Sequence, residues 1–111
     1  MTTNSDQFTH YAIAAQEDRC APRVDVRIPS MLRASGCHAV PVTVTNLSIS
    51  GFACETFSAL RPGMICWLTL PGLGSQQAEV VWTRGAQVGC AFANLLNQAV
   101  LDLMLSRHAR L

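Results

Sequence analysis

The chain has 111 residues, of which half are apolar and only 14% are charged, and its formal net charge is +1. This length suffices for one domain with its own core, and this composition excludes a disordered chain, a collagen and a coiled coil. The near-neutral charge argues against a general DNA or RNA binder. No apolar run approaches the roughly 18 residues that cross a bilayer, so we expect no membrane insertion.

The polar and small residues at positions 1–16 predict a flexible tail, and we place the domain at residues 17–111. After the tail, apolar residues alternate with polar ones in short stretches, which is typical of strands half-buried in a sheet. Turn-forming pairs such as Ser35-Gly36 and Arg84-Gly85 separate these stretches. The expected strands cover residues 24–29, 39–47, 51–55, 64–70, 77–83 and 86–93.

A helix is predicted after the last strand, with Asn94 as its N-cap and its end near Arg107. Leu101 and Leu105 fall on roughly the opposite side of this helix from its expected core face. They are either covered by the barrel and the tail, or they form an exposed apolar strip that meets a partner. Helical spacing assigns the core face to Leu96, Ala99, Val100 and Leu103.

Six short strands joined by turns and closed by one terminal helix predict a mainly β fold, a small antiparallel barrel. The five cysteines contain no C-x-x-C pair, which removes the common zinc and redox motifs. An odd number of cysteines without a secretion signal indicates reduced thiols in the cytoplasm. Cys20 lies in a polar segment and predicts an exposed thiol, whereas apolar surroundings predict core positions for Cys54, Cys66 and Cys90.

Catalysis has little support in this sequence. The three histidines and seven acidic residues are scattered, and none of them adjoins a motif with a nucleophile and its base. No spacing typical of metal ligands is present either. We therefore expect neither an enzyme nor a bound metal or cofactor.

Two local patterns carry chemistry: Arg19-x-x-x-Arg23 before the first strand, and Asn46-x-Ser48-x-x-Gly51 between the second and third strands. By chance the first occurs about once in two chains of this kind and the second about once in thirty. A guanidinium presents a planar fork of donors that matches phosphate oxygens and the O6/N7 edge of guanine. All eight basic residues are arginine, which suits this chemistry.

The second pattern complements the first. Asn46 and Ser48 offer short, positioned donors and acceptors for a base edge, and Gly51 permits a close backbone approach or a positive φ. A ligand with two guanines and two phosphates would use all of these groups. Without such a ligand, the two arginines would be solvated and residues 46–51 would be an ordinary turn.

At these residues the sequence resembles the PilZ domain, a bacterial receptor for cyclic di-GMP, and the resemblance runs from about Asp18 to the terminal helix. Residues 80–82 followed by residues 89–92 are similar to the late hairpin of the family. The resemblance implies a six-stranded antiparallel PilZ-type β-barrel with a C-terminal α-helix. In two departures, Asn46 stands where Asp is often found, and Asp18 stands where some relatives carry a further Arg.

The resemblance also implies the roles of individual residues. The two arginines would grip the phosphates and guanine, the Asn and Ser would read a guanine edge, and the glycine would make room. Trp82 is either a further ligand contact or a packing residue. The residues implied to bind cyclic di-GMP are Arg19, Arg23, Asn46, Ser48 and Gly51.

These residues predict a non-catalytic cyclic di-GMP receptor that signals when the ligand orders its N-terminal segment. The ordered segment would change the surface offered to a separate effector protein or to a second copy in a homodimer. The alternative is a PilZ-like adaptor that binds protein and not nucleotide. The strip formed by Leu101 and Leu105 favours this alternative, and the two intact motifs weigh against it.

Overall fold

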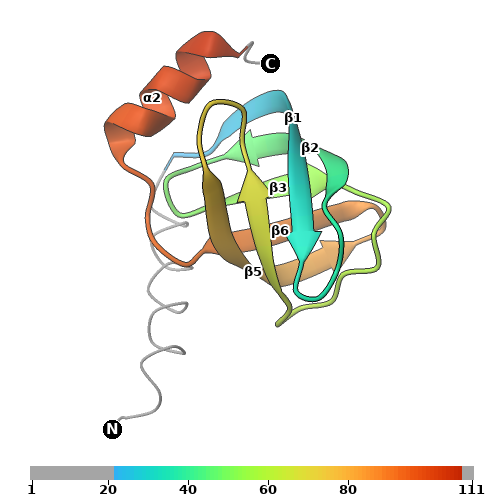
Figure 1. The fold of residues 1–111 in the computed structure, drawn as a ribbon. Helices are drawn as coiled ribbons and strands as arrows, with labels where there is room; N and C mark the ends of the chain where they lie inside the picture. Colours follow the sequence, from blue (N-terminus) through green and yellow to red (C-terminus); the bar gives the residue numbers. More distant parts are fainter. Residues whose placement is uncertain (1–21, 109–111) are drawn as a thin grey trace, which may run out of the picture.

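The computed structural model describes residues 22–108 (Figure 1). The predicted tail at residues 1–16, Arg19 and Cys20 lie outside the described residues. Six strands and one helix follow one another in the order β1 (Val24–Ala34), β2 (Val40–Leu47), β3 (Gly51–Glu55), β4 (Ile65–Thr69), β5 (Ser75–Arg84), β6 (Gln87–Phe92) and α2 (Gln98–Arg107).

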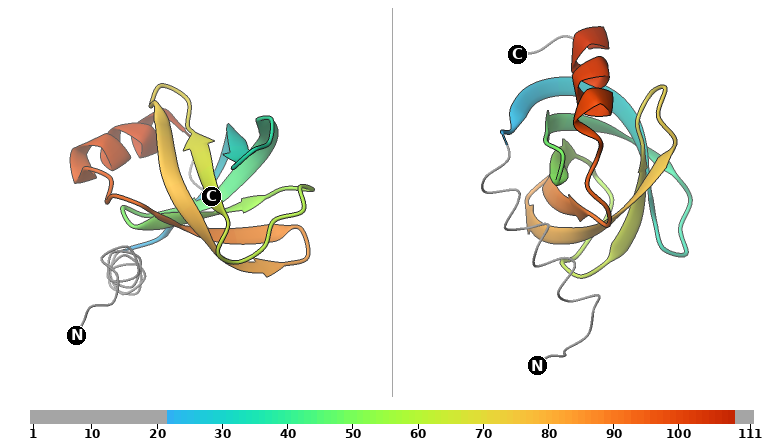
Figure 2. Two further views of the ribbon diagram at one scale, coloured as in Figure 1. Left: turned by 60° about the horizontal axis from the view of Figure 1, so that its bottom comes forward. Right: turned by 90° about the vertical axis from the view of Figure 1, so that its left-hand side faces the viewer.

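The strands form a closed antiparallel barrel in the order β1-β2-β3-β6-β5-β4, in which β4 pairs back onto β1 (Figures 1 and 2). This confirms the predicted fold of six antiparallel strands and a C-terminal helix. In this closed order each strand pairs with two neighbours. Within residues 22–108, no helix has the length and apolar character needed to cross a membrane.

Five strands begin and end within two residues of their predicted bounds, but β1 is five residues longer than predicted. Its alternation continues past Pro29, because Ser30, Leu32 and Ala34 are all buried. This extension lets β1 pair with two strands, because its last four residues pair with β4 and most of its length pairs with β2. The length of β1 therefore closes the barrel.

The barrel is filled by side chains that alternate inward along each strand. Phe52 of β3 and Phe92 of β6 are the largest of these side chains, and both are fully buried. Their ring centroids lie 5.3 Å apart with the planes tilted by 42°, a favourable arrangement for two aromatic rings. This pair joins the two adjacent strands that carry part of the site described below.

The predicted start of the helix at Asn94 is wrong by three residues. The N-cap is Asn97, whose side chain accepts a hydrogen bond of 2.8 Å from the backbone N–H of Ala99. The preceding residues instead connect β6 to the helix, and the N–H of Leu96 donates to the carbonyl of Ile49 at 2.8 Å. This bond to the β2–β3 turn holds the connection out of the helix.

The predicted core face of the helix is also wrong, except that Leu96 is buried in the core, although it precedes the helix. Leu101, Met104 and Leu105 are the buried side chains of α2, whereas Leu103 is 51% exposed. The strip at Leu101 and Leu105 therefore belongs to the core and is not a free docking surface. Both sides of this helix are apolar, and Met104 adds bulk to one side, so the larger apolar face packs on the barrel.

The core positions predicted for Cys54, Cys66 and Cys90 are confirmed, because all three side chains are buried. Burial raises the pKa of the Cys54 thiol to about 12, and the nearby Cys66 adds to this effect. A hydrogen bond with Cys66, together with burial, raises the pKa of Cys90. The thiols of Cys54 and Cys90 are therefore neutral at physiological pH and act as small hydrophobes.

Exchanging Leu105 for Ala should lower the free energy of unfolding by about 2–4 kcal/mol, because it removes buried methyl groups and leaves a cavity. Leu103→Ala, on the exposed side of the same helix, is the matched control and should change stability by less than about 0.5 kcal/mol. Urea unfolding followed by circular dichroism measures both values. Equal effects of the two substitutions would contradict the observed helix orientation.

Stability should also fall at alkaline pH. The folded-state pKa of Cys54 lies above the unfolded value of about 8.5, so its contribution is complete below pH 8.5 and is lost as the pH rises towards 12. Urea unfolding at successive pH values measures this decline. Cys54→Ala should make the decline shallower, whereas the same change at the exposed Cys37 should leave it unaltered.

Candidate functional site

A bulge in β2 determines where Asn46 points. Val42 and Val44 are buried in the core, and strict alternation would place Asn46 inside the barrel with them. The register of β2 against β3 shifts between Val44 and Asn46, and Leu47 takes the inward position. The shift delivers the amide side chain to the outer surface, a use of bulges common beside binding sites.

A second bulge, in β5, does the same for Trp82. Ala78 and Val80 are buried in the core, so continued alternation would turn the tryptophan inward. The register of β5 against β6 shifts between Val80 and Trp82, and the tryptophan is 38% exposed on the outer face. Two register shifts on different strands thus bring two sequence-predicted site residues to the outside of the barrel.

The two delivered side chains lie in one row that crosses the barrel. Small residues separate them, and the indole of Trp82 lies where a Cβ on Gly89 would stand. The guanidinium of Arg84 lies 5.7 Å from the centroid of the tryptophan ring. From β1 to β5 the paired residues of this row are Asp25, Asn46, Ala53, Gly89 and Trp82.

Asn46 has an incompletely satisfied side chain. Its residue is half-buried, and its Oδ1 atom is buried without a hydrogen-bond partner in the described structure. A buried acceptor that accepts no hydrogen bond costs about 1–3 kcal/mol. Such a group in a folded protein indicates a bound water, an ion or a ligand that supplies the missing donor. The site therefore contains an acceptor positioned for a donor from outside the barrel.

The turn after Asn46 is held by Ser48. The Ser48 hydroxyl accepts hydrogen bonds of 3.2 Å from the backbone N–H groups of both Ser50 and Gly51. The N–H of Ser48 donates to the carbonyl of Gly51 at 2.9 Å, and the Ser48 side chain is fully buried. This serine therefore fixes the shape of the turn. Its predicted contact with a guanine edge remains a prediction.

Gly51 allows β3 to approach β6. A Cβ at this position would collide with the carbonyl oxygen of Cys90, so only glycine fits without a shift of the backbone. Of the two reasons that the sequence offered for this glycine, the close backbone approach is confirmed, and it is an approach to β6. A positive φ is not the reason, because the positive-φ glycines lie at other turns. Room for a ligand at Gly51 is untested.

Arg23 lies next to this turn although 25 residues separate it from Ser48. It directly precedes the pair formed by Val24 of β1 and Leu47 of β2, so the antiparallel ladder brings it alongside the turn. Arg23 is exposed. The structure thus brings together four of the predicted ligand residues, Arg23, Asn46, Ser48 and Gly51, while the fifth, Arg19, lies outside the described residues.

The sequence identified these residues but did not predict the bulges that turn Asn46 and Trp82 to the outer face. Nothing in the alternating pattern signals the two bulges, and the row through Ala53 and Gly89 depends on strand pairings that are distant in sequence. One available signal was Gly89 within an apolar strand, since a glycine there often marks the close approach of another group. Within residues 22–108, no cluster of three or more potential metal ligands occurs.

A family model described as the PilZ domain matches residues 17–106, which is most of the chain, and no curated protein matches. PilZ domains are in general receptor or adaptor domains that bind cyclic di-GMP. The match includes both arginines and the whole of the row and turn described above. The chain therefore belongs to the PilZ domain family.

Proposed function

We propose that this protein is a cyclic di-GMP receptor whose ligand lies on the outer barrel face between Arg23 and the part of the row that runs from Asn46 to Trp82. The unpartnered Oδ1 atom of Asn46 is the observation that carries this proposal. A guanine edge presents N–H donors, and one of them would satisfy this buried acceptor. This new hydrogen bond would remove the destabilising effect of a buried acceptor without a donor, and would so favour binding.

The surrounding groups fit the rest of such a ligand. Arg23 is exposed beside the turn, where its guanidinium would form charge-assisted bonds to a phosphate. Arg19 would supply a second guanidinium from the segment before β1. Trp82 offers an aromatic surface on the same row as Asn46, on which a purine would stack. Ser48 and Gly51 would hold the turn to which these groups are attached.

The structure suggests a route by which binding would be sensed. Pro22 and Val24, on either side of Arg23, line a cavity of about 150 Å³ together with Leu101 and Leu105 of α2. The turn also contacts the connection to α2 through the bond between Leu96 and Ile49. Ligand-driven ordering of the segment that carries both arginines would alter the surface beside this helix, where a separate effector protein would bind.

Replacing Arg19 or Arg23 by Ala should weaken cyclic di-GMP binding about thirtyfold, roughly 2 kcal/mol, because each change removes charge-assisted bonds to the ligand. Isothermal titration calorimetry measures both affinities. Arg61→Ala, in an exposed turn after β3, is the matched control and should bind like the wild type. Unchanged affinity in both arginine variants would contradict the assigned roles.

A wild-type chain that shows neither heat of binding nor thermal stabilisation by cyclic di-GMP would favour the nucleotide-independent adaptor instead. The strip that supported the adaptor hypothesis is buried in the core, so the receptor is the better-supported function.

Substitutions of Asn46 should distinguish an effect on ligand binding from an effect on folding stability. Asn46→Ala should weaken binding at least tenfold, yet it should leave the free protein at least as stable, because it removes a buried acceptor that lacks a partner. Asn46→Asp should bind more tightly, since a charged acceptor forms stronger hydrogen bonds. Calorimetry and thermal unfolding of the same samples give both quantities. A variant that loses stability and binding in parallel would assign Asn46 a purely structural role.

A further inference from the structure

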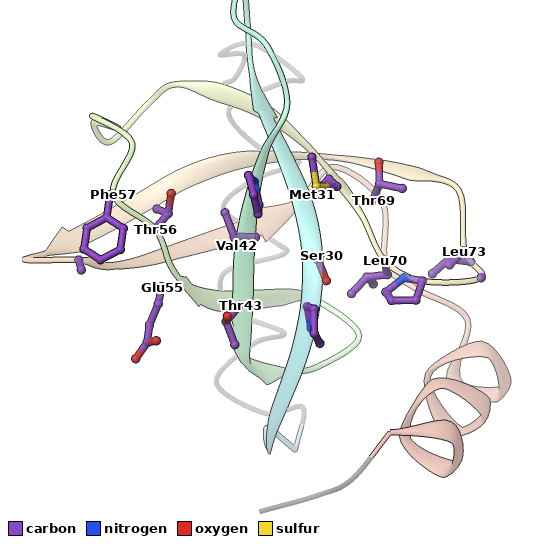
Figure 3. Close-up of a pocket in the computed structure, with 15 residues that line it drawn as sticks. Ser30, Met31, Val42, Thr43, Glu55, Thr56, Phe57, Thr69, Leu70 and Leu73 are labelled. Carbon is purple, nitrogen blue, oxygen red and sulfur yellow. The ribbon is translucent and has the colours of Figure 1, made fainter.

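An apolar groove of about 1060 Å³ lies on the outer barrel face, apart from the nucleotide site proposed above (Figure 3). Its floor includes Met31 of β1, which pairs with Pro41 of β2 on one side and Thr69 of β4 on the other. Met31 is 40% exposed. Arg23, Asn46, Ser48 and Gly51 do not line it. The groove is therefore a separate feature of this surface.

The two ends of the groove differ in shape. At one end Phe57, in the loop after β3, is fully exposed to solvent. At the other end the exposed Pro71 and the half-buried Leu73 lie on the loop after β4, whereas Leu70 of the same loop is buried. An exposed phenylalanine at the border of an apolar groove is a common mark of a protein contact. One end thus offers a projecting ring, and the other offers an aliphatic surface that would receive one.

The ends also differ in charge. Glu55 lines the groove beside the phenylalanine. At the leucine end, Nη1 of Arg107 lies 3.6 Å from the point where a Cβ on Gly72 would stand, and Gly72 is part of the groove wall. Glu55 and Arg107 are both exposed. A groove with opposite charges at its two ends matches itself when it is turned by 180°.

We propose that a second copy of this chain occupies the groove in a two-fold symmetric dimer. Phe57 of each copy would pack against Pro71 and Leu73 of the other, and Glu55 of each copy would pair with Arg107 of the other. Symmetry forms both contacts twice. This proposal does not depend on nucleotide binding.

The groove is lined by 15 residues, fewer than the roughly 20–30 per side of a standard interface, so the dimer should be weak.

The test is sedimentation velocity of the full chain at concentrations from about 1 to about 100 µM, the range in which a weak dimer forms. The wild type should shift from monomer to dimer. Glu55→Arg places two arginines together at both contacts, and Arg107→Glu places two carboxylates together, so each variant alone should dimerise at least tenfold more weakly. An equimolar mixture of the two variants should recover dimers, because the mixed pair has complementary charges at both contacts.

Three further variants complete the design. Phe57→Ser should abolish dimerisation, whereas Leu103→Ser, at an exposed position of α2 outside the groove, should not. Arg61→Glu controls for an unrelated charge reversal. Circular dichroism shows that each variant is folded. A wild type that stays monomeric, a mixture that fails to recover, or a Phe57→Ser dimer would overturn the proposal, and a monomeric wild type would leave the groove to a different protein.

Discussion

The site of this protein depends on two interruptions of strand alternation. A barrel of this size fills its interior with every second side chain, so the default position of both Asn46 and Trp82 is inside. Burying a carboxamide in this apolar interior without a hydrogen-bond partner would destabilise the fold. One added residue in each of two strands sends both side chains outward while the core stays apolar. The bulges therefore reconcile a stable core with a polar, aromatic outer row.

The turn between β2 and β3 links this row to the rest of the fold. Its backbone is fixed by the Ser48 hydroxyl on one side and by the contact of Gly51 with β6 on the other. Through Ile49 it is also bonded to the segment that leads into α2. A ligand held at this turn would consequently act on a rigid junction of strands and helix. A rigid junction transmits a local change better than a flexible loop, because its neighbours cannot relax independently.

The sequence was a good guide wherever one short-range rule decided the structure. Alternation and turn residues located all six strands, and the PilZ motif located residues that the ladder of β1 and β2 then brings together. The helix was harder to orient, because both of its sides are apolar and only contact with the barrel chooses between them. The bulges and the outer row could not be foreseen, since they depend on strand pairings such as that of Ala53 with Gly89, which lie 36 positions apart in the sequence. The groove with its oppositely charged ends is likewise a product of chain folding.

The positions of Ser48 and Gly51 bear on how the family motif should be understood in other sequences. Both residues serve the barrel itself, one by closing a turn and the other by letting two strands meet. A descendant that abandoned nucleotide signalling would still need them to fold, whereas it could exchange the asparagine and the arginines freely. A homologue that keeps the serine and glycine would thus be expected to keep the barrel fold. Only the asparagine and the arginines of the motif would indicate whether it binds the nucleotide.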